Sequence, residues 1–214
     1  MKRALFLIFI LLLAACDGGM NKKQFIRSVG ESGDLSKANE VEKYLEDSDP
    51  EVVMSSCFYL GYLGAREYIP RLEALLSDNN DQIVNMCASG LSLMVNKNDT
   101  YLLPKLHALL EHDFDLVQIS AIEAIGQIGS KDSVNFLLEG FESASSGKQG
   151  RIVQSLGKIG SADTLPFLEK YLQKIIDMDH SAPNKGGMRG SNLHPDTLQE
   201  ITEKAIQKIK SKNA

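Results

Sequence analysis

An internal repeat constrains this chain of 214 residues more than any other feature of its sequence. Three segments share the pattern Leu/Ile-Gly-x-Leu/Ile-Gly, and a degenerate fourth copy lies between the first two. The four copies occupy residues 60–64, 91–95, 125–129 and 156–160, so that successive copies begin 31, 34 and 31 residues apart. Pro70 and Pro104 repeat at the same period, and Pro166 follows two periods later. A repeat of this length predicts similar units stacked side by side.

Each repeat contains two segments with the spacing of an amphipathic helix. In the first segment apolar residues recur at i, i+3, i+6 and i+7, as in the stripe from Val134 to Phe141. The prolines fall in the first turn of these segments, where a missing N–H costs no hydrogen bond. A polar turn follows, and its Asp or Ser side chains can cap the second helix. The glycine inside each motif predicts close packing on the next repeat, and the final glycine predicts a left-handed C-cap.

The fold prediction is an all-α protein. It consists of an α-solenoid of about five helix pairs over residues 34–214, preceded by an N-terminal capping helix over residues 22–30. Residues 196–210 form the last second helix, in which Gln207 stands where the other repeats have glycine, as suits a terminal cap.

The repeats resemble the short HEAT-like repeat of the phycobilisome-lyase type. The resemblance covers residues 34–160 and a divergent last repeat, and it implies a fold and not an activity. The arginine that this family usually has after the valine of the second helix is missing. Its positions are taken by Val53, Val84, Gln118 and Gln149.

Composition narrows the classes of function. Hydrophobic residues make up 43% and charged residues 24% of the chain, which is typical of a folded protein. The formal net charge of −5 argues against nucleic-acid binding, because nucleic-acid-binding proteins usually present a basic surface.

The first 15 residues predict a signal peptide. Lys2 and Arg3 precede a ten-residue apolar run, which suits the core of a signal peptide and is too short to span a bilayer. The run ends in Leu-Ala-Ala-Cys at residues 13–16, which resembles the lipobox of bacterial lipoproteins. This resemblance implies cleavage before Cys16 and acylation of that cysteine, with residues 16–33 serving as lipidated N-terminus, tether and capping helix. An ordinary secretory signal that happens to contain a cysteine is the alternative.

The residue after Cys16 bears on the cellular location of the protein. Asp17 resembles the signal that retains enterobacterial lipoproteins in the inner membrane, which implies the periplasmic face of that membrane in a Gram-negative cell. Loss of Lys2 and Arg3 on cleavage would change the net charge from −5 to −7. A chain this acidic is repelled by anionic lipid, so we expect membrane contact to run through the lipid anchor alone.

Motifs of catalysis or cofactor binding are lacking. No histidine pair has zinc-ligand spacing on one helix, and the sequence holds no phosphate loop and no nucleophile elbow. We therefore predict no metal, no cofactor and no catalytic residue. The rival hypothesis is an enzyme or cofactor-handling protein with its site in the inserted loop 177–194, where Asp177, Asp179 and His180 could hold a cation. The other alternative for this loop is a tolerated disordered insertion without a function.

Two cysteines remain in the repeats. Cys57 and Cys87 fall on the second helices of adjacent repeats at neighbouring core positions. They are either free core residues or, in an oxidising compartment, a disulfide.

The outward positions of the second helices change in character along the chain. They are apolar or aromatic in the first two repeats and basic in the last two, and the same register places Ser89 and Ser120 outward. Contiguous exposed apolar groups are typical of a partner site, whereas the alternative is that these groups pack under the capping helix or between repeats. The predicted protein- or peptide-binding residues are Phe58, Tyr62, Met86, Leu93, Arg151, Lys158 and Lys204.

A first prediction concerns the anchor. Cys16→Ala removes the only thiol that the lipobox offers for acylation, so the variant should carry no labelled fatty acid and should leave the membrane fraction as uncleaved or soluble protein. Metabolic labelling with a fatty acid and fractionation measure both properties. Normal processing with retained lipid would refute the lipobox interpretation.

Overall fold

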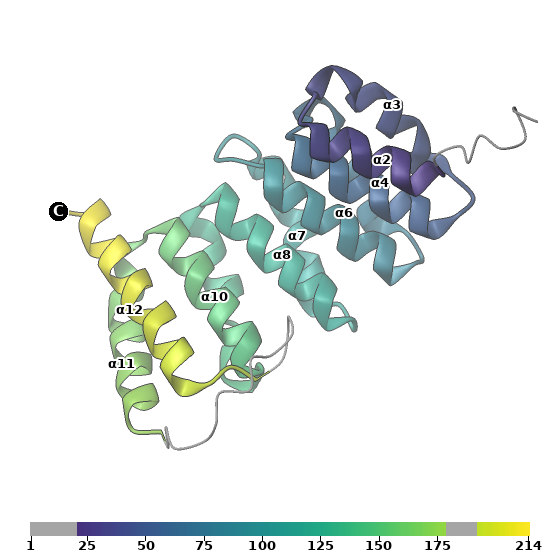
Figure 1. Cartoon of the computed structure of the whole chain (residues 1–214). Coiled ribbons are helices and arrows are strands. Elements are labelled where there is room, and N and C mark those ends of the chain that lie inside the picture. The colour runs from purple at the N-terminus through teal and green to yellow at the C-terminus, as the bar shows by residue number, and fades with distance from the viewer. Residues whose placement is uncertain (1–20, 179–191) are drawn as a thin grey trace, which may run out of the picture.

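Residues 21–178 and 192–214 are described by a computed structural model, and they contain helices and turns without any β-strand. Helix α2 (Lys22–Ser32) is followed by five helix pairs that stack in chain order (Figure 1). The predicted all-α solenoid with an N-terminal capping helix is therefore confirmed. Cys16 and most of the inserted loop, with Asp179 and His180, lie outside the described residues.

The two helices of a pair differ in length. The first helices are α3 (Ala38–Glu42), α5 (Ile69–Ala74), α7 (Leu103–Ala108), α9 (Val134–Leu138) and α11 (Leu165–Ile176). The second helices are α4 (Pro50–Leu63), α6 (Asp81–Met94), α8 (Asp115–Ile128), α10 (Ser146–Ile159) and α12 (Pro195–Lys212). Short 3-10 turns adjoin the first helices: η1 (Leu35–Lys37), η2 (Lys43–Glu46), η3 (Arg66–Tyr68), η4 (Leu75–Ser77), η5 (Thr100–Leu102), η6 (Leu109–Glu111), η7 (Lys131–Ser133), η8 (Phe141–Ser143) and η9 (Ala162–Thr164).

Polar side chains begin most of the second helices, as the sequence predicts. Asp49 accepts a hydrogen bond from the backbone of Glu51 at 2.9 Å, and Asn80 and Ser145 cap α6 and α10 in the same way. Helix α8 differs, because its N-cap is Phe114 and has no capping side chain. The acidic residues on either side of Phe114 therefore do not supply the expected cap.

The fourth first helix also departs from expectation. The apolar stripe from Val134 to Phe141 is not one helix, because α9 ends at Leu138. Gly140 has a φ of 72°, which is a left-handed conformation that glycine adopts at no steric cost, and it turns the chain into η8. Phe141 nevertheless stays in the core with 1% of its surface exposed.

The second helices approach one another closely at the motif glycines. A Cβ atom on Gly61 would lie 2.3 Å from the carbonyl oxygen of Gly90 on the next helix, and one on Gly126 would lie 2.5 Å from the hydroxyl of Ser155. These distances are far below van der Waals contact, so only glycine permits the observed spacing. The sequence prediction that these glycines lie at the packing surface is confirmed.

A disulfide joins α4 to α6. Cys57 and Cys87 are fully buried, and their Cα atoms lie 4.8 Å apart. Of the two alternatives that the sequence left open, free core cysteines or a disulfide, the structure has the disulfide.

The solenoid ends with α12, which packs on α10 and α11. Ile206 and Ile209 are buried as predicted, whereas Gln207 is exposed. The side chain of Asn213 donates to the carbonyl of Gly160 at 3.0 Å, and Lys212 donates to that of Lys158, so both satisfy the C-terminal end of α10. Among the described residues, none of the helices combines the length and the apolar character needed to cross a membrane.

A second prediction tests the register of the core. Ile125 on α8 is fully buried, so Ile125→Asp places an unpaired charge in the core and should cost several kcal/mol of the about 5–15 kcal/mol typical of a domain. Gln127 lies two residues further on and is exposed, which makes Gln127→Asp the matched control. Thermal melting followed by circular dichroism compares them. A melt of the Ile125 variant that matches wild type would contradict the register.

A third prediction tests the disulfide. The bond closes a loop with a sequence separation of 30 residues, and such a crosslink contributes about 2–4 kcal/mol to the free energy of unfolding. If the wild-type protein is unfolded and its disulfide is reduced before the measurement, the urea concentration at the midpoint of unfolding should therefore be lower. The double variant Cys57→Ala with Cys87→Ala should melt early and give the same midpoint with and without reductant. An equal response of both proteins would mean that the thiols are free.

Candidate functional site

The second helices lie side by side and form one continuous face of the solenoid, which we call the second-helix face (Figure 1). The capping helix α2 packs on α4 at the N-terminal end of this face, and α12 closes the C-terminal end. All seven predicted partner-binding residues lie on second helices.

An apolar cluster marks the N-terminal end, made of Phe58, Tyr62, Met86 and Leu93. Tyr62 and Leu93 expose 59% and 50% of their surface, respectively. The rings of Phe58 and Tyr62 stack with centroids 6.2 Å apart. The structure thus leaves part of the cluster accessible to a partner.

The capping helix covers a neighbouring aromatic ring. A Cβ atom on Gly30 of α2 would lie 2.1 Å from the ring of Tyr59, so α2 lies directly on that side chain. Phe58 and Met86 are only partly buried and line a shallow hollow of about 360 Å³ between α2, α4 and α6. An ion pair between Lys23 and Glu51 lies at its rim. Helix α2 thus covers Tyr59, which is outside the apolar cluster, whereas within the cluster Phe58 and Met86 are partly buried and Tyr62 and Leu93 stay exposed.

The middle of the face does not match the predicted outward stripe. Ser89 and Ser120 are 4% and 1% exposed, and the Ser120 hydroxyl donates to Asn85 on the neighbouring helix at 2.8 Å. The prediction that these serines face solvent is wrong, because adjacent second helices approach closely enough to bury them.

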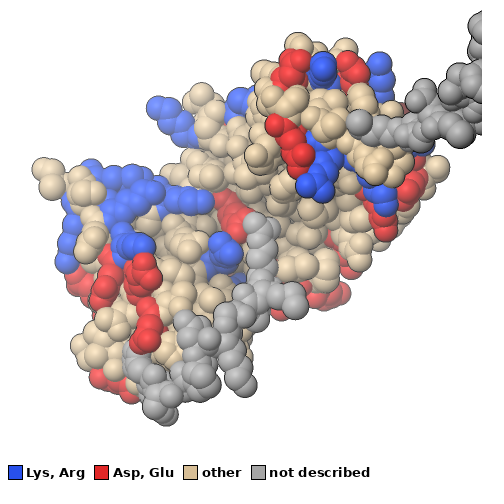
Figure 2. Space-filling model, viewed as in Figure 1, with Lys and Arg blue, Asp and Glu red and all other residues tan. Residues whose placement is uncertain are grey.

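The basic residues at the C-terminal end of the second-helix face lie on two helices. Lys and Arg side chains gather at the C-terminal end of the second-helix face, over α12 and the adjoining part of α10 (Figure 2). The structure brings Lys158, Lys204 and Lys208 to the lining of one hollow of about 330 Å³, which we call the lysine hollow. Arg151 does not line it, and its guanidinium lies 3.4 Å from the carboxylate of Glu123 on α8. Sequence reasoning placed Lys208 on the outward stripe without selecting it as a binding residue.

Burial changes the electrostatics of the central lysine. Partial burial lowers the pKa of Lys158 below its ordinary value, and the positive charges of Lys208 and Arg151 lower it further. The carboxylate of Glu123 acts in the opposite direction. The ammonium group of Lys158 thus lies in surroundings that would be stabilised by a further negative charge.

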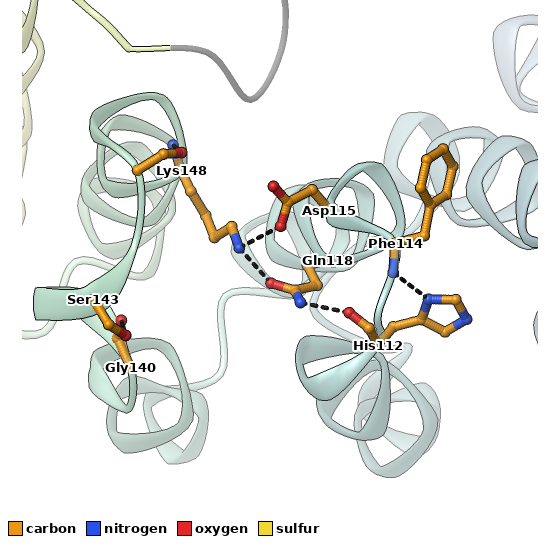
Figure 3. Close-up of polar contacts among 8 residues, drawn as sticks. His112, Phe114, Asp115, Gln118, Gly140, Ser143 and Lys148 are labelled. Atoms are coloured by element: carbon orange, nitrogen blue, oxygen red, sulfur yellow. Dashed lines mark hydrogen bonds and ion pairs between the residues drawn. The ribbon is translucent and has the colours of Figure 1, made fainter.

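A third hollow, which the sequence did not indicate, lies between α8 and the fourth repeat. Lys148 extends from α10 and donates to Asp115 at 2.8 Å and to Gln118 at 2.6 Å, and Gln118 donates in turn to the carbonyl of His112 (Figure 3). Gly140 belongs to the lining of this hollow of about 240 Å³. These contacts hold the third and fourth repeats together.

Two glutamines, at positions where the resembled repeat usually has arginine, donate to backbone carbonyls that precede their helices. Gln118 donates to the carbonyl of His112, and Gln149 donates to the carbonyl of Phe141 at 2.9 Å. Each glutamine thus ties a second helix to the end of the preceding first helix. The hydroxyl of Tyr171 donates to Gln149 at 2.8 Å, and burial raises the pKa of Tyr171 to about 12.

Within the described ranges, no group of three or more His, Cys, Asp and Glu side chains is arranged to hold a metal ion. Of the residues proposed as a cation site in the inserted loop, Asp177 is described, and it accepts a hydrogen bond from Gln173 at 3.1 Å.

Comparisons with known proteins agree with this architecture. A family model described as HEAT repeats matches residues 101–176. This chain contains HEAT-like repeats. The crystal structure of an engineered protein is similar over 92% of this chain and 93% of its own, with a TM-score of 0.61 and 18% identity. A second engineered protein has a TM-score of 0.56 and 16% identity, over 95% of this chain and 57% of its own. At these identities the likeness shows the fold alone. A search of curated protein sequences finds no match.

Proposed function

We propose that the protein is a membrane-anchored, non-enzymatic HEAT-repeat lipoprotein that binds a protein or peptide in the cell envelope. The observation that carries this proposal is the apolar cluster, because Tyr62 stays exposed beside the stacked ring of Phe58 and Leu93 stays exposed on the neighbouring helix α6. Contiguous exposed apolar side chains on a folded protein are typical of interaction sites.

The shape of the cluster suits a partner's side chain. Phe58 and Met86 line a hollow that is open to solvent, and Tyr62 stacks on Phe58 next to it. Aromatic side chains bury a large area at a small cost in conformational entropy, and they dominate the binding energy of many interfaces. The cluster would therefore supply most of the affinity.

The basic end of the face would add selectivity. Arg151, Lys158 and Lys204 favour a partner with acidic residues, in a protein that is otherwise acidic. Exposed charges at the rim of an interface mainly raise the association rate at low salt. Because Arg151 pairs with Glu123 and Lys204 pairs with Glu200, we expect both to contribute less than Lys158.

Two features support the envelope as the location. The sequence at residues 13–16 resembles a lipobox, and the disulfide between Cys57 and Cys87 is of a kind that persists in oxidising compartments. Asp17 favours the periplasmic face of the inner membrane in a Gram-negative cell.

A fourth prediction tests the cluster. Phe58→Ala with Tyr62→Ala should abolish capture of the partner, because truncation of a buried aromatic anchor costs about 2 kcal/mol or more, roughly thirtyfold in affinity. Crosslinking and pull-down from the native envelope, quantified by mass spectrometry, measure the capture. Circular dichroism must show that the variant is folded.

The control removes exposed apolar side chains from the 3-10 turns that adjoin the first helices. Tyr101 and Leu35 expose 55% and 46% of their surface in η5 and η1. Tyr101→Ala with Leu35→Ala should leave capture unchanged. Wild-type capture by a folded Phe58 and Tyr62 variant would refute the proposed site.

A further inference from the structure

The lysine hollow combines an apolar floor with a charged rim. Gly157 of α10 and Ala205 of α12 pack together at the floor, where a Cβ atom on Gly157 would lie 3.0 Å from Ala205. Ile201 adds a partly buried apolar side chain to the lining. The volume of about 330 Å³ is sufficient for a medium-sized apolar side chain.

The cations around this hollow are not equally available. Lys204 pairs with Glu200, and Lys210 pairs with Glu169 at 2.9 Å. In contrast, Lys158 and Lys208 have no acidic side chain within ion-pair distance among the residues that the structure describes. Partial burial disfavours the ammonium of Lys158, the nearby carboxylate of Glu123 favours it, and the charge of Lys208 disfavours it. An anion brought to this point would be stabilised by both lysines, neither of which has an ion-pair partner of its own among the described residues.

We infer that the lysine hollow binds an acidic peptide segment, inserting one apolar side chain over Gly157 and Ala205 while carboxylates beside it pair with Lys158 and Lys208. This inference rests on the proposed function, since it names the chemistry of the partner at the basic end. It differs from the sequence prediction, which named Arg151, Lys158 and Lys204, because Lys208 takes the place of Arg151 and Lys204 is already paired with Glu200.

The lining favours a peptide over other anions. Inorganic phosphate would leave the apolar floor unused. An anionic lipid surface is attracted by the summed charge of a basic patch, and here the ion pairs of Lys204 and Lys210 reduce that sum. A carboxylate next to an apolar side chain satisfies both parts of the hollow.

The test uses a fluorescein-labelled peptide in which one leucine lies between glutamates, and fluorescence anisotropy with the full chain. The wild-type protein should bind this peptide more tightly at low than at high salt. Replacement of the glutamates by glutamine, or of the leucine by serine, should each weaken binding roughly tenfold.

Variants of the protein should give the matching result. Lys158→Gln with Lys208→Gln should weaken binding of the glutamate peptide by at least about tenfold and leave the glutamine peptide unaffected. Gln154→Glu is nearly isosteric and places a competing carboxylate at the lining of the hollow, so it should also weaken binding. The control Lys97→Gln with Lys131→Gln makes the same change in net charge at exposed positions elsewhere and should bind as wild type.

Each alternative has its own outcome. Equal displacement of the peptide by inorganic phosphate and by an unlabelled glutamate peptide would mean a simple anion site. Sedimentation with anionic vesicles that depends on Lys158 and Lys208, without peptide binding, would mean a lipid-binding surface. Either result overturns the inference, as does unchanged peptide binding by the folded double variant.

Failure here is distinguishable from failure of the proposed function. The variant Phe58→Ala with Tyr62→Ala should still bind the labelled peptide, because the apolar cluster lies on α4 and α6, away from α10 and α12. If the peptide does not bind and that variant still loses the native partner, the inference fails and the proposed function stands.

Discussion

Close contact between the backbones of neighbouring second helices is the constraint on which the rest of this structure depends. At Gly61 and Gly90 the helices approach so closely that even one methyl group would overlap a carbonyl oxygen. The same column continues through Gly126 against Ser155 and through Gly157 against Ala205. This spacing sets the stacking of the repeats, brings Cys57 within disulfide distance of Cys87, and buries the serines in the middle of the face. The accessible members of the predicted binding set consequently lie toward the two ends.

The two ends of the second-helix face differ in chemistry. At the N-terminal end the exposed surface is aromatic and aliphatic, and at the C-terminal end it is lysine-rich around an apolar floor. Apolar contact supplies affinity with little directional preference, whereas paired charges select among partners and orient them. A partner that contacts both ends would therefore bind in one direction only.

Periodicity predicts the fold of this chain well, because the repeat appears independently in the glycine motifs, the prolines and the apolar stripes. It predicts the exposure of single residues less well. Ser120 occupies an outward position by helical phase alone, and it is buried because the neighbouring helix lies unusually close. Arg151 has the same phase as the lysines, yet it pairs with Glu123 from another repeat. Helical phase carries no information about distances between helices, and this is why the fold could be predicted from the sequence while the composition of the lysine hollow could not.

The disulfide also determines how the solenoid bears a mechanical load. A pull on the N-terminus travels along the chain to Cys57 and then crosses the covalent bond to Cys87. The residues between the two cysteines, with the whole of α5, are thereby bypassed and carry no tension. Among the joints between consecutive second helices, the first that is held by non-covalent contact alone is the one between α6 and α8. Phe58, Tyr62 and Met86 of the apolar cluster lie inside the bypassed segment, so tension does not pass through that part of the chain.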